Sequence, residues 1–445
     1  MVFDPNKGKL VCQYCFNEFD PPARQQPADG APAREYKAPT ASAQYSNDAA
    51  GSERRKQRIG NQAAKDAAIH ELLERAPWST AESSSTVSYT CSNCGAELLC
   101  DASVSMMECP YCGNQTMTPG TMEGTMRPDM VIPFAIDKNR CLEGLAKHYK
   151  GKMLLPGTFA ESNKLEHVQG VYVPFWLFDA RAKGYGSYHC EDDTRHYSGD
   201  DEVIETRHYE CERKCTAAFD RVPVDSSSKM PNGHMDAIEP YDYSKLVPFN
   251  ISYLPGYSAE VYDEDADVCW ERPRERIEHS VSSALKSSLH YDRVSTRAEE
   301  IDVDRADAIY ALMPVWLLHT TWEGEDYLFA MNGQTGKFIG DLPVAKGKAA
   351  GWFGGIALPL LILSIFLFVM PEMRSDDPRI GMVVFLCLLP FIIAGIVLWI
   401  FYSQMKTANE ASEANDYMHD VEFPVKRDRY THTTRRVIHH ESNND

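Results

Sequence analysis

The sequence predicts an α+β body that is followed by two membrane-spanning helices near the C-terminus. Two blocks of the 445-residue chain, Trp352 to Met370 and Ile380 to Tyr402, contain no Asp, Glu, Lys or Arg. The preceding segments alternate between strand-like and helix-like hydrophobic patterns, and two cysteine pairs stand before them at a spacing typical of a small metal-binding module. These observations predict a membrane-anchored α+β protein.

Charge and cysteine usage narrow the class of protein further. The formal net charge is -19, which disfavours nucleic acid as a partner because such proteins normally gather excess Lys and Arg. The cysteine count is odd, at 13, and the first residues, MVFDPNKGKL, do not resemble a signal peptide. We therefore expect a reducing compartment, where Cys-x-x-Cys pairs act as metal ligands or redox dithiols.

The strongest local signal is a zinc ribbon over residues 87–120. Two Cys-x-x-Cys-Gly turns are separated by a short segment, and four thiolates complete a tetrahedral site. Because all four positions are filled, we expect a structural Zn²⁺; iron or a redox dithiol is the alternative. The expected ligands are Cys91, Cys94, Cys109 and Cys112.

The N-terminus resembles half of a second ribbon, over residues 1–19. A shift of 97 positions lays Cys12 and Cys15 on the second ribbon pair. One pair cannot close a tetrahedral site, so these two cysteines are predicted as a half site. The hypothesis is that the true start lies upstream and supplies the other pair. The alternatives are a degenerate relic and completion by another subunit.

Residues 20–60 read as a flexible linker, since they are rich in Pro, Ala, Gln, Ser and Asp and poor in large aliphatic residues. A helix with further linker follows over residues 61–86, and its helical composition begins at Glu53. The linker and this helix precede the ribbon and the main body.

The body reads as two related β-α-β-β halves, residues 130–245 and 246–345. The sequence VIPFAI in the first half is matched by LVPFNI in the second, and each is followed by a helix with one apolar face. Each helix leads to a strand, YVPFWLF or LMPVWLL, whose proline predicts a strand start or edge. A hairpin with glycines at turn positions of positive φ ends the second half.

The two apolar blocks, residues 352–370 and 380–402, are predicted transmembrane helices. The first is about 28 Å long at about 1.5 Å per residue, which matches a hydrocarbon core of about 30 Å. Two buried helices of a soluble core are the alternative. Lys346, Lys348 and Lys406 flank the pair and predict a multi-pass protein of the cytoplasmic membrane with both termini, including the tail 403–445, in the cytoplasm. Apart from Cys387 and the terminal Tyr402 they hold no ionisable residue, which favours anchoring over transport.

Catalytic signatures are lacking in the sequence. There is no G-x-x-x-x-G-K-[ST], no H-E-x-x-H and no G-x-S-x-G. Histidines and cysteines gather with acidic residues between His189 and Cys215, a pattern compatible with either a second metal site or exposed surface positions. Surface positions are the favoured interpretation of His189, His196 and His208.

The motifs VCQYC, YTCSNCGAELLCD, CPYCGN, GVYVPFWLFDA and FAMNGQTGKFIGDLPV, with the C-terminal spans, resemble the bacterial membrane proteins described as TFIIB-type zinc-ribbon-containing. The resemblance covers nearly the whole chain and implies zinc binding and a membrane location. Relatives carry a further Cys-x-x-Cys pair before the position of Met1. Some are labelled as primosomal, replication-factor-Y-like helicases, but the residues that a motor requires are missing here.

The expected function is therefore a non-enzymatic scaffold, sensor or recognition module at the cytoplasmic face of the membrane. Its expected partners are the lipid bilayer and a protein or small ligand. Nucleic acid is not expected at the intact ribbon, because no Lys or Arg occurs between Arg75 and Arg127. The alternatives are a nucleic-acid-associated role and an enzyme with an unrecognised site in the duplicated body.

Overall fold

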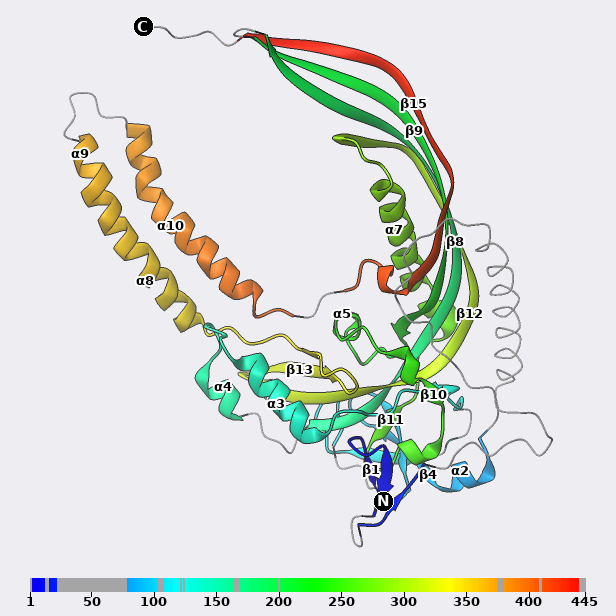
Figure 1. Cartoon of the computed structure of the whole chain (residues 1–445). Coiled ribbons are helices and arrows are strands. Elements are labelled where there is room, and N and C mark those ends of the chain that lie inside the picture. The colour runs from blue at the N-terminus through cyan, green and yellow to red at the C-terminus, as the bar shows by residue number, and fades with distance from the viewer. Residues whose placement is uncertain are drawn as a thin grey trace. The chain divides into compact units, whose positions relative to one another are not determined.

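A computed structural model describes residues 2–12, 16–21, 78–102, 108–120, 122, 125–162, 168–198, 201–373, 380–407 and 410–439. The chain forms two compact units (Figure 1). Unit 1 comprises Met1–Pro174, Lys229–Val261 and Leu312–Glu410, and unit 2 comprises Phe175–Ser228, Tyr262–Ala311 and Ala411–Asp445. Most of the expected linker and the helix expected from Glu53 lie outside the described residues.

The body is a mixed α+β structure, as the sequence predicts. In each half a short strand, a helix and two longer strands follow one another. These elements are β7 (Met130–Val131), α3 (Lys138–Tyr149), β8 (Val168–Ser198) and β9 (Asp201–Asp225), then β10 (Val247–Pro248), α7 (Glu271–Ser287), β12 (Arg293–Trp322) and β13 (Glu325–Asn332). The compact units do not coincide with the halves 130–245 and 246–345, because β8 and β12 each contribute to both units.

Smaller elements are inserted between these. They are α2 (Thr80–Ser84), α4 (Gly157–Ser162), α5 (Asn232–Ala237), the 3-10 turns Tyr243–Lys245 and Ile251–Tyr253, β11 (Ser258–Glu260), α6 (Ala266–Cys269), β14 (Phe338–Ile339) and the 3-10 turn Asn415–Tyr417. A separate N-terminal sheet consists of β1 (Val2–Asp4), β2 (Lys9–Val11) and β3 (Glu18–Phe19).

The large sheet has the strand order β10-β7-β12-β8-β11-β5-β4-β6, with β9 and β13 pairing β8 and β12. Its last three strands are β5 (Glu97–Asp101), β4 (Thr86–Cys91) and β6 (Met117–Gly120). The expectation that proline marks a strand start or edge is wrong for Pro174 and Pro314, which lie inside the interior strands β8 and β12. For Pro174 the physical reason is a change of partner. Tyr172 pairs with β11, whereas Phe175 begins the pairing with β9, so Pro174 lies where its missing N–H is not needed.

In the hairpin of β13 and β14, Gly336 has the expected positive φ of 81°. Gly333 is not among the residues of positive φ, so the prediction for that glycine is wrong. Asn332 organises the turn instead, because its side-chain oxygen accepts hydrogen bonds from the backbone N–H groups of Gln334 and Thr335.

Two helices of unit 1 are long and apolar enough to cross a membrane. The first begins with α8 (Lys346–Ser364), continues as the π-helical turn Ile365–Val369 and leads into α9 (Met370–Met373); the second is α10 (Ile380–Ser403). Their mean hydropathies are 2.4 and 2.9. They lie side by side (Figure 1) and leave large apolar side chains exposed, such as Phe366 and Trp399.

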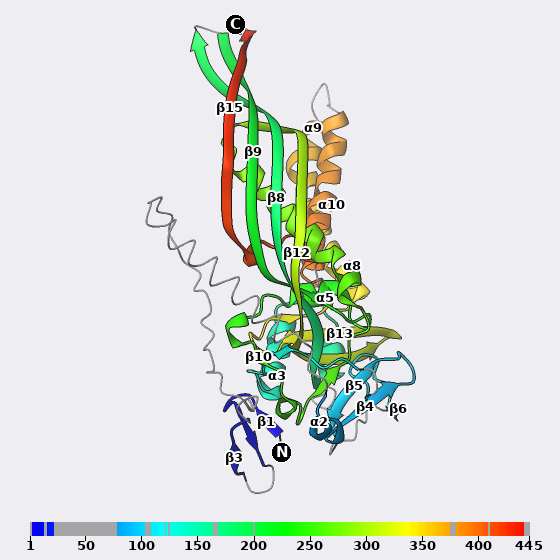
Figure 2. The same cartoon turned by 90° about the vertical axis from the view of Figure 1, so that its right-hand side faces the viewer.

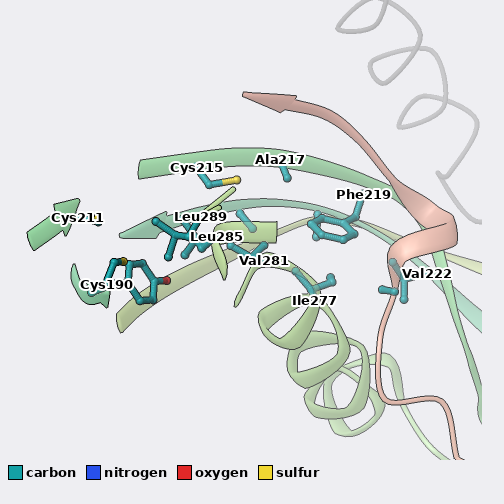
Figure 3. Close-up of a cluster of buried hydrophobic side chains, with 14 residues drawn as sticks. Cys190, Cys211, Cys215, Ala217, Phe219, Val222, Ile277, Val281, Leu285 and Leu289 are labelled. Carbon is teal, nitrogen blue, oxygen red and sulfur yellow. The ribbon is translucent and has the colours of Figure 1, made fainter. Parts of the chain in front are cut away.

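Unit 2 is built on long antiparallel strands, β9, the adjoining parts of β8 and β12, and β15 (Met418–His439) (Figure 2). Strand β15 was not predicted, since residues 403–445 were interpreted as a tail. It pairs with β9 from Met418↔Phe219 to His439↔Asp201. Helix α7 covers one face of these strands and buries Ile277, Val281 and Leu285 against it (Figure 3).

A bulge in unit 2 predicts a pH-dependent change in stability. Asp179 accepts a hydrogen bond of 2.7 Å from the backbone N–H of Arg221, which has a positive φ of 58°. Burial, aided by the nearby charge of Asp220, raises the pKa of Asp179 from 3.8 to about 6. The folded protein therefore binds this proton more tightly than the unfolded chain, and the associated stability falls as pH rises from 3.8 through about 6.

The substitution Asp179→Asn is expected to remove this loss, because the amide oxygen can still accept the Arg221 hydrogen bond without carrying charge. At pH 7 the variant should be more stable than the native protein by about 3 kcal/mol, and below the usual carboxyl pKa the two should converge. Unfolding of both proteins followed across this pH range measures the difference. A constant difference would contradict the assignment to Asp179.

Candidate metal centre

The predicted ribbon is a three-stranded element formed by β4 (Thr86–Cys91), β5 (Glu97–Asp101) and β6 (Met117–Gly120). Its two cysteine turns have the same hydrogen bonds. The N–H of Gly95 donates to the carbonyl of Cys91, and the N–H of Gly113 donates to that of Cys109, each at 2.9 Å. Both glycines have positive φ, 72° and 66°, a conformation that explains why glycine follows each pair.

The four sulfurs converge on one point. The Sγ atoms of Cys91 and Cys112 are 3.7 Å apart, as are those of Cys94 and Cys109, and all four lie within 4.8 Å of one another. A tetrahedral zinc with bonds of about 2.3 Å requires S–S separations of about 3.8 Å. The four predicted ligands are thus together, and their geometry and chemistry fit a metal such as zinc.

The surroundings of these thiols favour partial ionisation before a metal binds. Burial opposes ionisation of Cys91, but the backbone N–H groups of Cys94 and Asn93 and the amide of Asn114 outweigh it and lower its pKa to about 6. Burial raises the pKa of Cys94 to about 11. Metal binding must therefore displace protons, which makes loading stronger as pH rises.

The ribbon is joined to the rest of unit 1 by its backbone and by a buried side-chain hydrogen bond. Ala259 of β11 pairs with Leu99 of β5, which extends the main sheet into the ribbon. The Tyr111 hydroxyl donates to Oε2 of Glu260 at 2.5 Å. Glu260 is only 2% exposed, and burial together with its charge holds the pKa of Tyr111 well above the usual value. The tyrosine is therefore a reliable donor at neutral pH.

Replacing Tyr111 by Phe is expected to weaken the packing of the ribbon on β11 by about 1–3 kcal/mol, because the buried Glu260 loses a hydrogen-bond donor. The β5 and β11 amides should therefore exchange hydrogen faster in this variant. The double variant with Glu260→Gln should recover part of the loss, since a neutral amide is less costly to bury. Unchanged exchange in Tyr111→Phe would show that the hydrogen bond contributes nothing measurable.

The N-terminal half site has one described cysteine. Cys12 begins a turn like those of the ribbon: its N–H donates to the carbonyl of Asn17, and Phe16 donates to the carbonyl of Cys12. Phe16 has the positive φ, 56°, that glycine has in the ribbon. Cys15 lies outside the described residues.

A pocket of about 440 Å³ lies beside the N-terminal sheet, within unit 1. Its lining is largely apolar and aromatic, with one acidic and one basic side chain. The residues are Val2, Phe3, Asp4, Pro5, Val11, Phe16, Lys138, Gly256, Tyr257 and Trp316. This size falls in the range of small-molecule sites, about 300–1,000 Å³.

Unit 2 brings together residues that sequence reasoning assigned to the surface. His189, Glu191 and His208 form a second group of side chains that can hold a metal, whereas His196 is exposed on the same strand. The nearby cysteines Cys190, Cys211 and Cys215 are buried in the α7 core instead. The signal that was missed is the His-x-Glu pair, whose members share one face of a strand.

No protein-family model matches the chain, and no solved structure shows significant similarity to it. The chain is similar to YdjG, an uncharacterised protein of Bacillus subtilis strain 168. The two are 32% identical over 335 residues, and the match covers 63% of this chain and 98% of YdjG. The similarity therefore extends over practically the whole relative, and the chain belongs to the same family as YdjG.

Proposed function

We propose that this chain is a membrane-anchored, zinc-stabilised recognition protein, a non-enzymatic scaffold or sensor whose body binds a protein or small ligand. The observation that carries the proposal is the convergence of four sulfurs in a ribbon that continues the main sheet. A metal at that point would fix one end of unit 1 in a single conformation. It would also place the ribbon among the TFIIB-type zinc ribbons that the sequence resembles.

Zinc suits this donor set, because four thiolates at tetrahedral spacing bind Zn²⁺ and leave no open position for substrate. The role proposed for the metal is therefore structural. Cys91, Cys94, Cys109 and Cys112 would hold it, while the backbone N–H groups and the Asn114 amide around Cys91 stabilise sulfur charge. The four-thiolate site would carry a net charge of about -2, which disfavours binding of phosphate at the ribbon.

Anchoring is the second part of the proposal. The exposed apolar surfaces of α8 and α10 would face lipid, and the lysines at their outer ends support a hairpin with both termini in the cytoplasm. Reduced cysteines in the ribbon agree with that side of the membrane. The pocket lined by Tyr257 and Trp316 supports a small-ligand role for unit 1.

Alkaline extraction of membranes that contain the full-length protein tests the anchoring. The protein is expected to stay in the pellet, and a membrane-impermeant thiol reagent applied to intact cells should not reach the ribbon. Recovery in the supernatant, or labelling of these cysteines from outside, would refute the proposed arrangement.

Crosslinking and pull-down from native membranes test recognition. A partner captured by the native protein should be lost from Cys91→Ser and kept by Cys100→Ala, a buried β5 cysteine outside the four-sulfur group. Equal capture by both variants would show that partner binding does not depend on the four-sulfur group.

A further inference from the structure

The sheet of unit 2 carries a compact group of polar side chains on the face opposite α7. His189 and Glu191 alternate along β8 with residues that are buried beneath α7, so they point to the other face. Glu191 lies directly across from His208 on β9. The group of His189, Glu191 and His208 is called the triad below, and its side chains are only 25%, 22% and 13% exposed.

Three atoms of the triad form an almost equilateral triangle. His189 Nε2 is 3.2 Å from Glu191 Oε1, His208 Nδ1 is 3.2 Å from the same oxygen, and the two nitrogens are 3.3 Å apart. A tetrahedral zinc with bonds of about 2.0–2.1 Å requires ligand separations of about 3.3–3.4 Å. The triangle is thus one face of a coordination tetrahedron, and a cation about 2.0 Å from all three atoms fits it.

The three atoms of the triangle are best satisfied together by a cation. If both ring nitrogens carry hydrogen and donate to the Glu191 carboxylate, the two N–H groups crowd side by side on one oxygen with their nitrogens 3.3 Å apart. If either nitrogen lacks hydrogen, its lone pair faces the carboxylate oxygen. A divalent cation at the centre makes all three contacts attractive. The other nitrogen of His189, Nδ1, is buried without a hydrogen-bond partner in the described part of the chain, so the ring's polar contacts all lie on the triad side.

Neighbouring side chains hold two of the three ligands in this orientation. Arg293 binds the second oxygen of Glu191, with Nη2 at 2.6 Å and Nε at 2.7 Å, which leaves Oε1 directed at the histidines. His208 Nε2 lies 3.0 Å from the hydroxyl of Thr434 on β15. The His208 ring also stacks on His432, with centroids 4.4 Å apart and planes 8° from parallel. Such outer contacts are typical of metal ligands, whose orientation and basicity they fix.

We propose that the triad is a second metal site, which binds a divalent transition metal of the zinc type through His189 Nε2, His208 Nδ1 and Glu191 Oε1. Two imidazoles and one carboxylate suit Zn²⁺, Co²⁺ or Ni²⁺ and not Mg²⁺ or Ca²⁺, which take oxygen ligands. With three protein ligands the fourth position is open to water or to an exchangeable ligand, unlike the four-sulfur ribbon. The triad therefore binds a metal that exchanges, and it does so independently of the ribbon.

The test is equilibrium dialysis of the full-length protein in detergent against buffered free zinc, with metal and protein measured in the same sample. The native protein is expected to hold two zinc ions per chain. His208→Ala is expected to hold one, and the matched control His196→Ala, an exposed histidine on the neighbouring strand β8, should hold two. One zinc per chain in the native protein, or two in His208→Ala, would overturn the assignment.

A second variant guards against a simple folding defect in His208→Ala. Thr434→Val removes only the hydroxyl beside His208 Nε2, so the site should still fill at saturating zinc, with affinity about 10- to 100-fold lower than in the native protein. Cobalt bound at this site should show weak ligand-field bands without the intense sulfur charge-transfer bands of the ribbon. Unchanged affinity in Thr434→Val, or second-site cobalt bound through sulfur, would also count against the triad.

Discussion

Replacing Cys91 by Ser is expected to abolish metal binding at the ribbon and to unfold residues 87–120. Apparent contributions of structural zinc to small zinc-finger peptides are about 10–16 kcal/mol, larger than any single side chain contributes. Three remaining thiols cannot complete a four-thiolate site. Cys91 is the cysteine of the four-sulfur group whose surroundings best stabilise a thiolate, with a pKa of about 6. The loss should appear as one zinc fewer per chain and as new protease cleavage within the ribbon.

Cys100 supplies the matched control. It lies on β5 of the same ribbon and is 1% exposed, but it is not part of the four-sulfur group. Burial raises its pKa to about 12, so it stays a neutral thiol that acts in packing. Cys100→Ala should therefore keep its zinc and lose about 1 kcal/mol. If Cys91→Ser retained the metal and resisted protease as Cys100→Ala does, the ribbon would not depend on these thiolates.

The second large effect is expected in unit 2, where Leu285→Ala should cost about 2–5 kcal/mol. Leu285 is fully buried where α7 meets the long strands. The helix approaches β8 so closely that a Cβ at Gly184 would lie 2.7 Å from Val281 Cγ1 and 3.0 Å from Leu285 Cδ1. This tight contact limits collapse around the cavity left by the smaller side chain.

Hydrogen exchange of the β8 and β9 amides is the suitable measurement, since it reports on unit 2 within the full-length chain. Amide exchange should become faster in Leu285→Ala. In Ser283→Ala, an exposed position on the same helix, the free energy of opening should stay within about 0.5 kcal/mol of the native value. Equal protection in both variants would mean that α7 does not stabilise the strands.

Local patterns in the sequence were sufficient to predict helices α3 and α7 and the cysteine turns. Helix α3 follows Asp137, whose side chain accepts the N–H of Arg140, and it buries Cys141 and Leu145 as its periodicity predicts. The two cysteine turns of the ribbon were predictable because each pair needs only a tight turn, and glycine marks that turn. The apolar spans were predictable from length and composition alone.

Features that depend on distant pairing were not predictable in the same way. The chain between β9 and β15 exceeds 190 residues, so nothing in the local sequence identifies Phe219 and Met418 as partners. The same holds for the triad, because the side-by-side position of Glu191 and His208 depends on the β8–β9 register. The division of the chain into two units was not predictable either. It arises because β8 and β12 extend well beyond their apolar segments, and the polar parts of these strands carry no comparable strand pattern in the sequence.

X-ray absorption at the zinc edge tests the four-sulfur centre most directly. The suitable sample is full-length His208→Ala protein loaded with zinc, because it retains all four ribbon cysteines and lacks one histidine of the triad. The expected first shell is four sulfurs at about 2.3 Å. A shell dominated by nitrogen and oxygen, or a protein that binds no zinc with its cysteines reduced, would contradict the account.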